Sequence, residues 1–109
     1  MKIITFIQST EGMIHNNSLE AFCAAQKFSE SLKAEIKIVT FDPIVAKELC
    51  QYKSNGIILI DNDELKNYNP IYYLHALYET FNDQNTDLFF CGHTYETRDW
   101  VPRLSARLN

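Results

Sequence analysis

Four times along these 109 residues, a short run rich in β-branched and aromatic residues is followed by a segment with helical spacing. The expected strands are apolar almost throughout, and they span residues 2–8, 35–41, 57–60 and 87–92. Continuous apolar strands joined by helices are typical of a parallel sheet whose two faces are both covered. The sequence therefore predicts one α/β domain over residues 1–109, with three α/β/α layers and a mostly parallel sheet. The pattern does not specify the order of the strands.

The first expected helix follows a short loop, STEGMIHN (residues 9–16). Asn17 is expected to cap this helix, which runs to about Lys33, and Glu20 stands three residues later in the capping-box position. Residues at helical spacing predict which face is buried. That stripe consists of Ala21, Ala24, Ala25, Phe28 and Leu32.

The second and third expected helices both open with a capping side chain followed by proline. Asp42–Pro43 and Asn69–Pro70 have this arrangement, in which proline at the first helical position loses no hydrogen bond. A polar loop, DNDELKNYN (residues 61–69), precedes the third helix. The apolar stripe of that helix is expected at Ile71, Leu74, Leu77 or Tyr78, and Phe81.

The closing segment, GHTYETRDWVPRLSARLN (residues 92–109), contains all three arginines and the single tryptophan. Asp99 is expected to cap a fourth helix or to lie in its first turn, where a carboxylate favours the positive end of the helix dipole. Pro102 is then expected in that first turn, because a deeper proline removes a helical hydrogen bond. Helical spacing continues to the end without a glycine or proline stop, although Asn109 can serve as an unusual cap. We therefore expect a fragment of a longer polypeptide, with its C-terminal part missing.

Charge is unevenly distributed along the chain. Residues 1–97 carry 7 lysines and 13 acidic residues, whereas residues 98–109 carry 3 arginines and 1 aspartate. An acidic body argues against nucleic-acid binding, which needs a broad basic face. The small basic tail is better suited to one local contact.

The remaining composition indicates a cytoplasmic protein without membrane insertion. No apolar run approaches the roughly 20 residues that cross a bilayer, and the first residues lack the cleavage site of a signal peptide. Cys23, Cys50 and Cys91 are odd in number and lack a C-x-x-C spacing. We expect free thiols in a reducing compartment.

Ligands of parallel sheets bind at the carboxyl ends of the strands, so residues that bind a cofactor or metal are expected there. A phosphate cradle needs several glycines, but the chain has only Gly12, Gly56 and Gly92 and no G-x-G-x-x-G or Walker pattern. Carboxylates at strand ends can bind a hard metal, although a helix cap and a solvated loop explain them better. These carboxylates are Asp42, Asp61, Asp63 and Glu64. We expect neither a cofactor site nor a metal site in these residues.

Cys91 and His93 stand at the end of the fourth expected strand, and they raise the question of a nucleophile with its base. Such a pair needs an orienting group, and the spacing alone does not supply one. A strand thiol followed by a loop imidazole is the simpler interpretation. No catalytic residue is therefore expected.

The helix that closes the chain carries the most informative charges. Asp99, Arg103 and Arg107 are spaced by four and share one helix face. Arg98 and Arg103 would present forked donors for a carboxylate or phosphate beside the helix start. An internal Arg–Asp pair that ties the loop to the helix uses the same bonds. Both interpretations stay open from the sequence.

The segment GHTYETRDWVPRLSARL resembles a signature in the N-terminal domain of the electron transfer flavoprotein alpha subunit. SLEAFCAAQKFSESLKAEIKIVTF and ILIDNDELKNYNPIYYLHAL are similar to earlier parts of the same domain, in the same order. The matching signature residues are Thr94, Arg98, Asp99, Pro102, Arg103 and Leu104. Thr97 stands where the family usually has glycine, and Ser105 replaces a usual alanine.

The resemblance implies a scaffold rather than an enzyme. It implies a fold like that of adenine nucleotide hydrolases, in a domain that packs against the beta subunit of a heterodimer. FAD would be bound mainly by a C-terminal domain absent from these residues, and AMP or a second FAD by the partner subunit. The whole complex would carry electrons from dehydrogenases to an acceptor. The interface or structural motif would comprise Thr94, Arg98, Asp99, Pro102 and Arg103.

Two other functions compete with this one. A stand-alone adenine-nucleotide-binding domain, similar to stress proteins, would need a glycine-rich loop after the fourth strand, where GHTYETRD offers a single glycine. A thiol- or metal-dependent enzyme would have to use Cys91 and His93.

Overall fold

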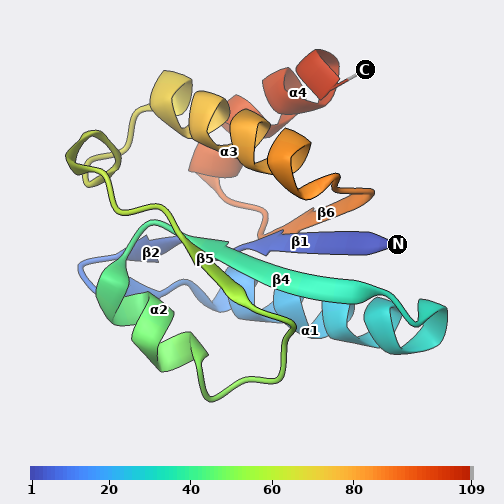
Figure 1. Ribbon diagram of the computed structural model, residues 1–109. Coiled ribbons are helices and arrows are strands. Elements are labelled where there is room, and N and C mark those ends of the chain that lie inside the picture. Colours follow the sequence, from blue (N-terminus) through green and yellow to red (C-terminus); the bar gives the residue numbers. More distant parts are fainter. Residues whose placement is uncertain (109) are drawn as a thin grey trace.

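A parallel four-stranded sheet lies between two pairs of helices in the computed structural model, which describes residues 1–108 (Figure 1). The sheet strands are β1 (Lys2–Phe6), β4 (Glu35–Thr40), β5 (Ile57–Leu59) and β6 (Leu88–Cys91). The helices are α1 (Asn16–Leu32), α2 (Pro43–Leu49), α3 (Pro70–Gln84) and α4 (Tyr95–Leu108). The predicted α/β fold is confirmed. Asn109, named above as a possible cap, lies outside the described residues.

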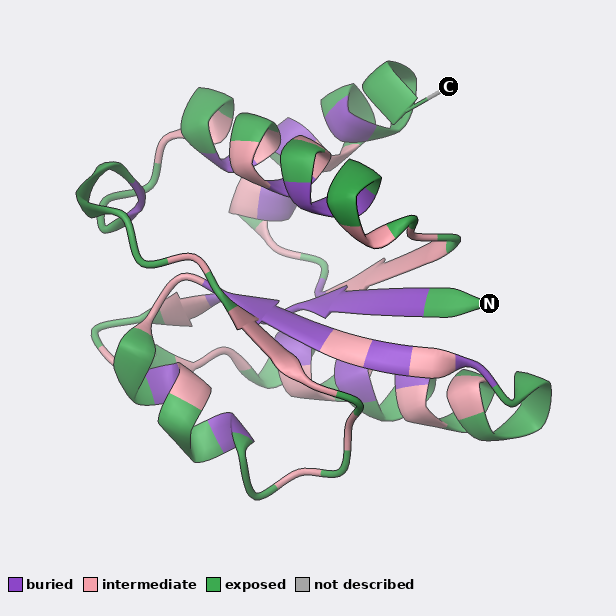
Figure 2. Cartoon of the chain, viewed as in Figure 1, coloured by how far each residue is buried: buried purple, intermediate pink, exposed green. Residues whose placement is uncertain are grey.

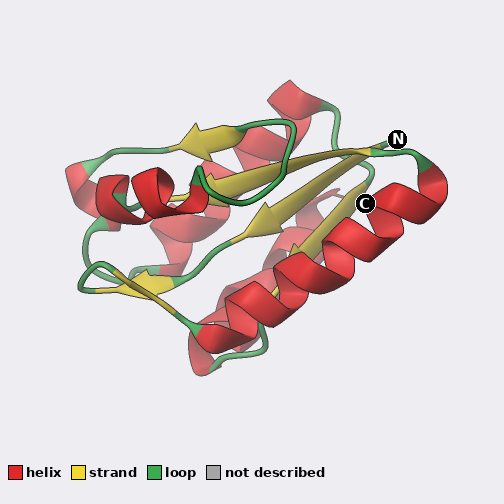
Figure 3. Cartoon of the chain, turned by 90° about the horizontal axis from the view of Figure 1, so that it is seen from below, coloured by secondary structure: helices red, strands yellow, loops and turns green. Residues whose placement is uncertain are grey.

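The order of the strands is β5-β4-β1-β6, with every neighbouring pair parallel. In the register of the sheet, Ile3 of β1 lies beside Ile36 of β4 and Leu88 of β6. Helices α1 and α2 cover one face and lie in front of the sheet when the molecule is seen from below (Figure 3), while α3 and α4 cover the other. The sheet grows from β1 toward β5 and then continues on the opposite side of β1 with β6. The carboxyl ends of β1 and β6 therefore form the switch point at which such sheets bind ligands.

Alternating side chains of β1 and of Ile7, which directly follows it, supply both halves of the core. Ile3 and Ile7 pack with α1 and α2, whereas Ile4 and Phe6 pack with α3 and α4. The central strands are consequently buried, and the edge strands β5 and β6 are mainly intermediate (Figure 2). Trp100 of α4 is fully buried, and its ring contacts that of Phe6 edge-on at a centroid distance of 5.4 Å. The last helix is thus part of the core rather than an appendage.

The predicted cap of the first helix is wrong. The cap and the start of α1 lie two residues earlier than predicted, with His15 as the N-cap residue, and the Asn17 side chain instead donates to the backbone carbonyl of His93 at 2.8 Å. The buried face of α1 also differs from the predicted one, because the buried residues are Ser18, Phe22 and Ala25. Three of its expected members, Ala24, Phe28 and Leu32, are exposed.

Two short elements occupy stretches expected to be loops. Strands β2 (Ser9–Thr10) and β3 (Met13–Ile14) form an antiparallel hairpin whose two turn residues, Glu11 and Gly12, have positive φ. A 3₁₀ helix, η1 (Asp63–Leu65), buries Leu65 beneath the loop that precedes α3. Each element is shorter than the window that hydrophobic periodicity needs.

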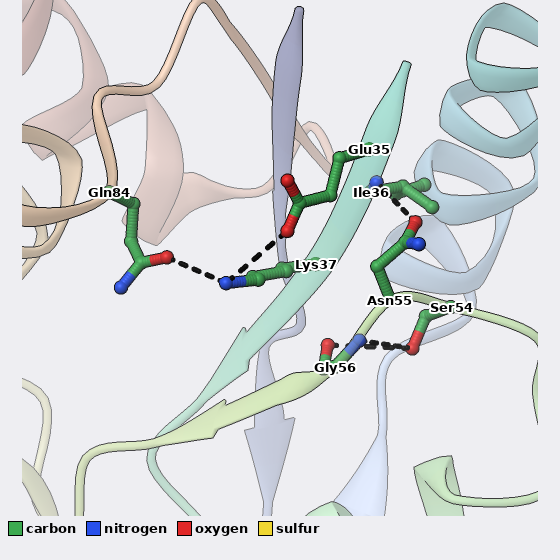
Figure 4. Close-up of polar contacts among 7 residues, drawn as sticks. All are labelled: Glu35, Ile36, Lys37, Ser54, Asn55, Gly56 and Gln84. Carbon is green, nitrogen blue, oxygen red and sulfur yellow. Dashed lines mark hydrogen bonds and ion pairs between the residues drawn. The ribbon is translucent and has the colours of Figure 1, made fainter. Parts of the chain in front are cut away.

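Polar side chains at the amino end of the sheet serve the fold (Figure 4). Lys37 of β4 reaches across to the Gln84 side-chain oxygen at 2.9 Å and to the Glu35 carboxylate at 3.4 Å. Just before β5 begins, the Asn55 side chain accepts a hydrogen bond from the Ile36 amide at 2.8 Å. These contacts join β4 to α3 and to the start of β5, so this cluster is structural.

The expected stripe of α3 contains two residues with opposite environments. Leu77 is fully buried, whereas Ile71 is 64% exposed. We predict that Leu77→Ala lowers the free energy of unfolding by about 2–5 kcal/mol, because it leaves a cavity in the core. Ile71→Ala, a change of similar size on the same helix, should cost less than about 1 kcal/mol. Urea unfolding followed by circular dichroism measures both, and equal losses would contradict the assigned burial.

Candidate functional site

Helix α4 begins with a reciprocal cap formed by two threonines. The Thr94 hydroxyl accepts from the Thr97 amide at 3.1 Å, and the Thr97 hydroxyl accepts from the Thr94 amide at 2.9 Å. Thr97 also donates to the Gly92 carbonyl at 2.8 Å and is almost fully buried. The two side chains thus satisfy the backbone amides of Thr94 and Thr97, which are the two amides that a capping box satisfies.

This cap corrects two predictions about the fourth helix. Because the helix begins at Tyr95, Asp99 neither caps it nor lies in its first turn, and Pro102 lies well inside it. Sequence reasoning overlooked the Thr94–Thr97 pair because threonine is an unusual second member of a capping box. Pro102 is tolerated on the exposed side of the helix, where water can reach the carbonyl that loses its donor.

The switch point between β1 and β6 is closed by the chain's own side chains. Gln8, which follows β1, receives a hydrogen bond on its side-chain oxygen from the Thr94 hydroxyl at 2.7 Å. Its backbone amide donates to the Ser18 hydroxyl of α1 at 2.9 Å. Together with the Asn17–His93 contact, these bonds hold the first turn of α1 against the end of β6. The sequence predicted none of them, because they join residues far apart in the chain.

Gly92 is the glycine that a phosphate cradle would use here. A Cβ atom at Gly92 would stand 2.8 Å from the backbone carbon of Asn17 and 2.9 Å from the amide nitrogen of Ser18. The glycine therefore serves close packing of β6 against α1 and does not leave space for a ligand. The described residues at this switch point do not fit the pyrophosphate of a flavin or another dinucleotide.

Two of the three arginines of α4 contact other groups of the chain. The Arg103 guanidinium lies 3.6 Å from the Asp99 carboxylate, with side chains 56% and 41% exposed. The Arg107 guanidinium lies over the ring of Tyr78 on α3, 5.1 Å from its centroid. The shared face predicted for Asp99, Arg103 and Arg107 therefore lies on the side of α3.

Asp99 is also held from the loop before α3. The Tyr68 hydroxyl donates to Asp99 Oδ2 at 3.0 Å and to the Glu96 carbonyl at 3.2 Å. Burial, followed by the hydrogen bond to Asp99, raises the pKa of Tyr68 above its ordinary value. Tyr68 thus stays protonated, and its hydroxyl links the loop before α3 to α4. The sequence did not indicate this role.

Arg98 points away from the contact between Tyr68 and Asp99. It lies five residues before Arg103, which rotates it by roughly 140° around the helix. The two guanidinium groups therefore do not form the joint fork considered from the sequence. Arg98 instead lines a groove of about 350 Å³ between the end of β6 and α4. Its other walls include Cys91, His93, Val101 and Pro102.

Cys91 does not have the environment of an activated nucleophile. Burial raises the pKa of the Cys91 thiol to about 11, so the thiol is neutral near pH 7. Cys91 and His93 line the same groove, but no hydrogen bond joins them within residues 1–108. The geometry supports the interpretation as a strand thiol and a loop imidazole.

Two of the four candidate carboxylates at strand ends, Asp42 and Asp63, have partners within the chain. Asp42 caps α2 by accepting from the Ile44 amide at 2.9 Å, as predicted. Asp63 pairs with Lys66 at 2.9 Å. In the part of the chain that the structure describes, no group of three or more His, Cys, Asp or Glu side chains is placed to hold a metal ion. Nor is any helix of residues 1–108 both long and apolar enough to cross a bilayer.

Comparison with known proteins relates this arrangement to one family. The family model described as electron transfer flavoprotein domain matches residues 3–109. Protein FixB of Clostridium saccharobutylicum is 26% identical over 106 residues, which are 95% of this chain and 32% of that protein. The electron transfer flavoprotein subunit alpha of Bacillus subtilis is 26% identical over 98% of this chain and 33% of its own. The acryloyl-CoA reductase electron transfer subunit beta of Anaerotignum propionicum is 27% identical over 98% and 30%, respectively. The chain spans about a third of the length of these relatives.

Removing the Thr97 hydroxyl tests the cap. Thr97→Val keeps the shape of the side chain but leaves the Thr94 amide and the Gly92 carbonyl without their partner. We expect a loss of about 1–3 kcal/mol in unfolding free energy. Ser105→Ala, on the exposed side of the same helix, is the control and should change little. Urea unfolding measures both, and a Thr97→Val protein as stable as the control would refute the cap.

The raised pKa of Cys91 predicts slow chemistry at that thiol. At pH 8 we expect a thiol-reactive disulfide reagent to modify the exposed Cys23 and Cys50 first, and Cys91 at least about tenfold more slowly. Peptide mapping by mass spectrometry assigns each rate. The Cys91 rate should rise with pH up to about 11, because only the thiolate reacts. Fast modification of Cys91 at pH 7 would revive the nucleophile hypothesis.

Proposed function

The chain belongs to the electron transfer flavoprotein domain family, and from that premise we propose that it is the N-terminal scaffold domain of an alpha-type subunit. In this role it docks a beta subunit in a heterodimer that carries electrons between dehydrogenases and an acceptor. FAD is the redox cofactor of the complex, and AMP or a second FAD occupies the partner subunit. The domain has no chemistry of its own.

The closed switch point is the observation that carries this proposal. Parallel sheets of this kind bind nucleotides between the carboxyl ends of strands such as β1 and β6. Here that position is filled by the bonds among Gln8, Ser18 and Thr94 and by the packing of Gly92. A flavin associated with this domain would accordingly be bound mainly by other polypeptide. This supports the role of the domain as a scaffold.

The relatives also support a scaffold domain that is separate from the part of the protein that binds the cofactor. Several are named as electron transfer subunits, and this chain spans only about a third of their length. The larger remainder offers room for a cofactor domain. The stand-alone adenine-nucleotide binder requires an open cradle after β6, so the packing of Gly92 against α1 disfavours it.

Cofactor content gives the direct test. We expect residues 1–109, purified alone, to show no stoichiometric flavin absorbance and no heat of binding with AMP or ATP at micromolar concentration. Mixed with the electron transfer flavoprotein beta subunit of the same organism, the chain should form a 1:1 complex by analytical ultracentrifugation. A yellow isolated chain with one flavin per molecule would overturn the scaffold assignment. Micromolar ATP binding would instead support the stand-alone nucleotide binder.

A further inference from the structure

A row of oxidisable aromatic side chains connects the core beneath α4 with the loop before α3. The ring of Trp100 on α4 lies 6.3 Å from that of Tyr73 on α3, and the Tyr73 ring lies 5.1 Å from that of Tyr68 in the loop, measured between centroids. Both pairs meet edge to face, at interplanar angles of 70° and 89°. Rings in such contact are close enough for an electron to pass from one to the next.

The neighbouring phenylalanines do not divert an electron from this row. Phe6 and Phe89 also contact Trp100, at centroid distances of 5.4 and 6.2 Å. A phenyl ring carries neither a hydroxyl group nor a ring nitrogen, so it is much harder to oxidise than an indole or a phenol. An electron vacancy in this part of the core is therefore restricted to the tryptophan and the tyrosines.

The tryptophan end of the row has no group that can take a proton. The Trp100 side chain is fully buried, and no group within residues 1–108 accepts a hydrogen bond from its Nε1. An indole that loses one electron becomes a strong acid, but here the proton has no nearby acceptor. The oxidised ring accordingly stays a cation, which is a stronger oxidant than the deprotonated radical.

The loop end of the row has the proton acceptor that the tryptophan end lacks. The Tyr68 hydroxyl donates to Asp99 Oδ2 at 3.0 Å, within the reach of about 2.6–3.2 Å that proton transfer needs. Arg103 pairs with the other oxygen, Oδ1, which leaves Oδ2 to the phenol. In the described part of the chain no carboxylate accepts a hydrogen bond from the Tyr73 hydroxyl. Tyr73 can therefore pass an electron on, whereas Tyr68 can lose an electron and its proton together.

We propose that Trp100, Tyr73 and Tyr68 form a route that moves a one-electron oxidation from the core to the loop before α3. An inorganic radical, such as the carbonate radical anion, takes one electron from Trp100 and is reduced to carbonate. One electron then passes from Tyr68 through Tyr73 to the Trp100 cation, and the phenolic proton of Tyr68 moves to Asp99 Oδ2. The products are an intact Trp100, a neutral Tyr68 radical and a protonated Asp99. A thiolate returns one electron to Tyr68 and becomes a thiyl radical, and the proton goes back from Asp99.

This route goes beyond the proposed scaffold role and does not depend on it. No substrate is turned over, so the domain remains without catalysis of its own. The route protects Trp100, whose buried ring holds α4 in the core. A radical that stayed on the indole would react irreversibly with oxygen, whereas a tyrosyl radical is reduced back to the phenol.

Laser flash photolysis of the chain tests the route, because Trp100 is its single tryptophan. A pulse at the long-wavelength edge of tryptophan absorption, where tyrosine does not absorb, ejects an electron from Trp100. Nitrous oxide and tert-butanol remove the ejected electron and the hydroxyl radical that it generates. The visible absorption of the tryptophan radical should decay while the near-ultraviolet absorption of a tyrosyl radical rises. The rate should not change with protein concentration, because the transfer occurs within one molecule.

Three variants separate the route from simple packing. Tyr68→Phe keeps a ring against Tyr73 but removes the phenol, so the tyrosyl radical should be lost. Asp99→Asn keeps a side-chain oxygen that accepts the hydrogen bond but cannot take the proton, so the radical should be lost again. Tyr95→Phe is the matched control, since Tyr95 is 89% exposed, and it should leave the yield of tyrosyl radical unchanged. Circular dichroism of each variant shows that the fold is retained.

Each outcome bears on a separate part of the proposal. A wild-type chain without a tyrosyl radical, or an equal yield of it in Tyr68→Phe, would overturn the route. A full yield in Asp99→Asn would overturn the role of Asp99 as the proton acceptor. None of these results changes the docking proposal, which complex formation with the beta subunit tests independently.

Discussion

The contact between the first turn of α1 and the end of β6 is the constraint on which the rest of this domain depends. It consists of Gly92 packed against the backbone of Asn17 and Ser18, and of hydrogen bonds that tie α1 to the residues after the carboxyl ends of β1 and β6. It fixes where β6 ends, and the Thr94–Thr97 cap then fixes where α4 begins. Since α4 supplies the fully buried Trp100, the core under α3 and α4 depends on the same contact.

That closure fills the place at which nucleotide binders with similar layers hold their ligand. In a sheet of this order, the crevice outside β1 and β6 is the natural place for a phosphate, and an open crevice needs glycine backbone and free amides. Here the glycine is covered, the Ser18 hydroxyl of α1 accepts from the Gln8 amide, and the Thr97 hydroxyl accepts from the Thr94 amide just before α4. This filled crevice is compatible with the docking role that we propose for the domain.

Much of the fold could be predicted from the sequence, and the errors have physical causes. Strands with continuous apolar runs and helices opened by Asp42–Pro43 and Asn69–Pro70 carry local signals, and the structure confirms them. The Asn17 cap was wrong because a side chain that caps well locally forms a bond with His93, 76 residues away. Tyr68 was overlooked for the same reason, since its role appears only when α4 and the loop before α3 come together. Thr97 was overlooked for a local reason, because threonine is an unusual second member of a capping box. Local chemistry therefore predicted the elements, whereas the site depends on contacts between distant residues.

The rotation of α4 explains how one short helix serves both the core and the surface. Trp100 and Leu104 face the sheet, and the four-residue spacing of Asp99, Arg103 and Arg107 keeps those charges on the side of α3. An exposed pair such as Asp99–Arg103 contributes less than about 1 kcal/mol, so its value lies in orienting Asp99 for the Tyr68 hydroxyl. The five-residue step from Arg98 to Arg103 places the remaining cation on the opposite side, in the groove between the end of β6 and α4. Had Arg98 stood one residue later, its guanidinium would have lain with that of Arg103 on the side of α3.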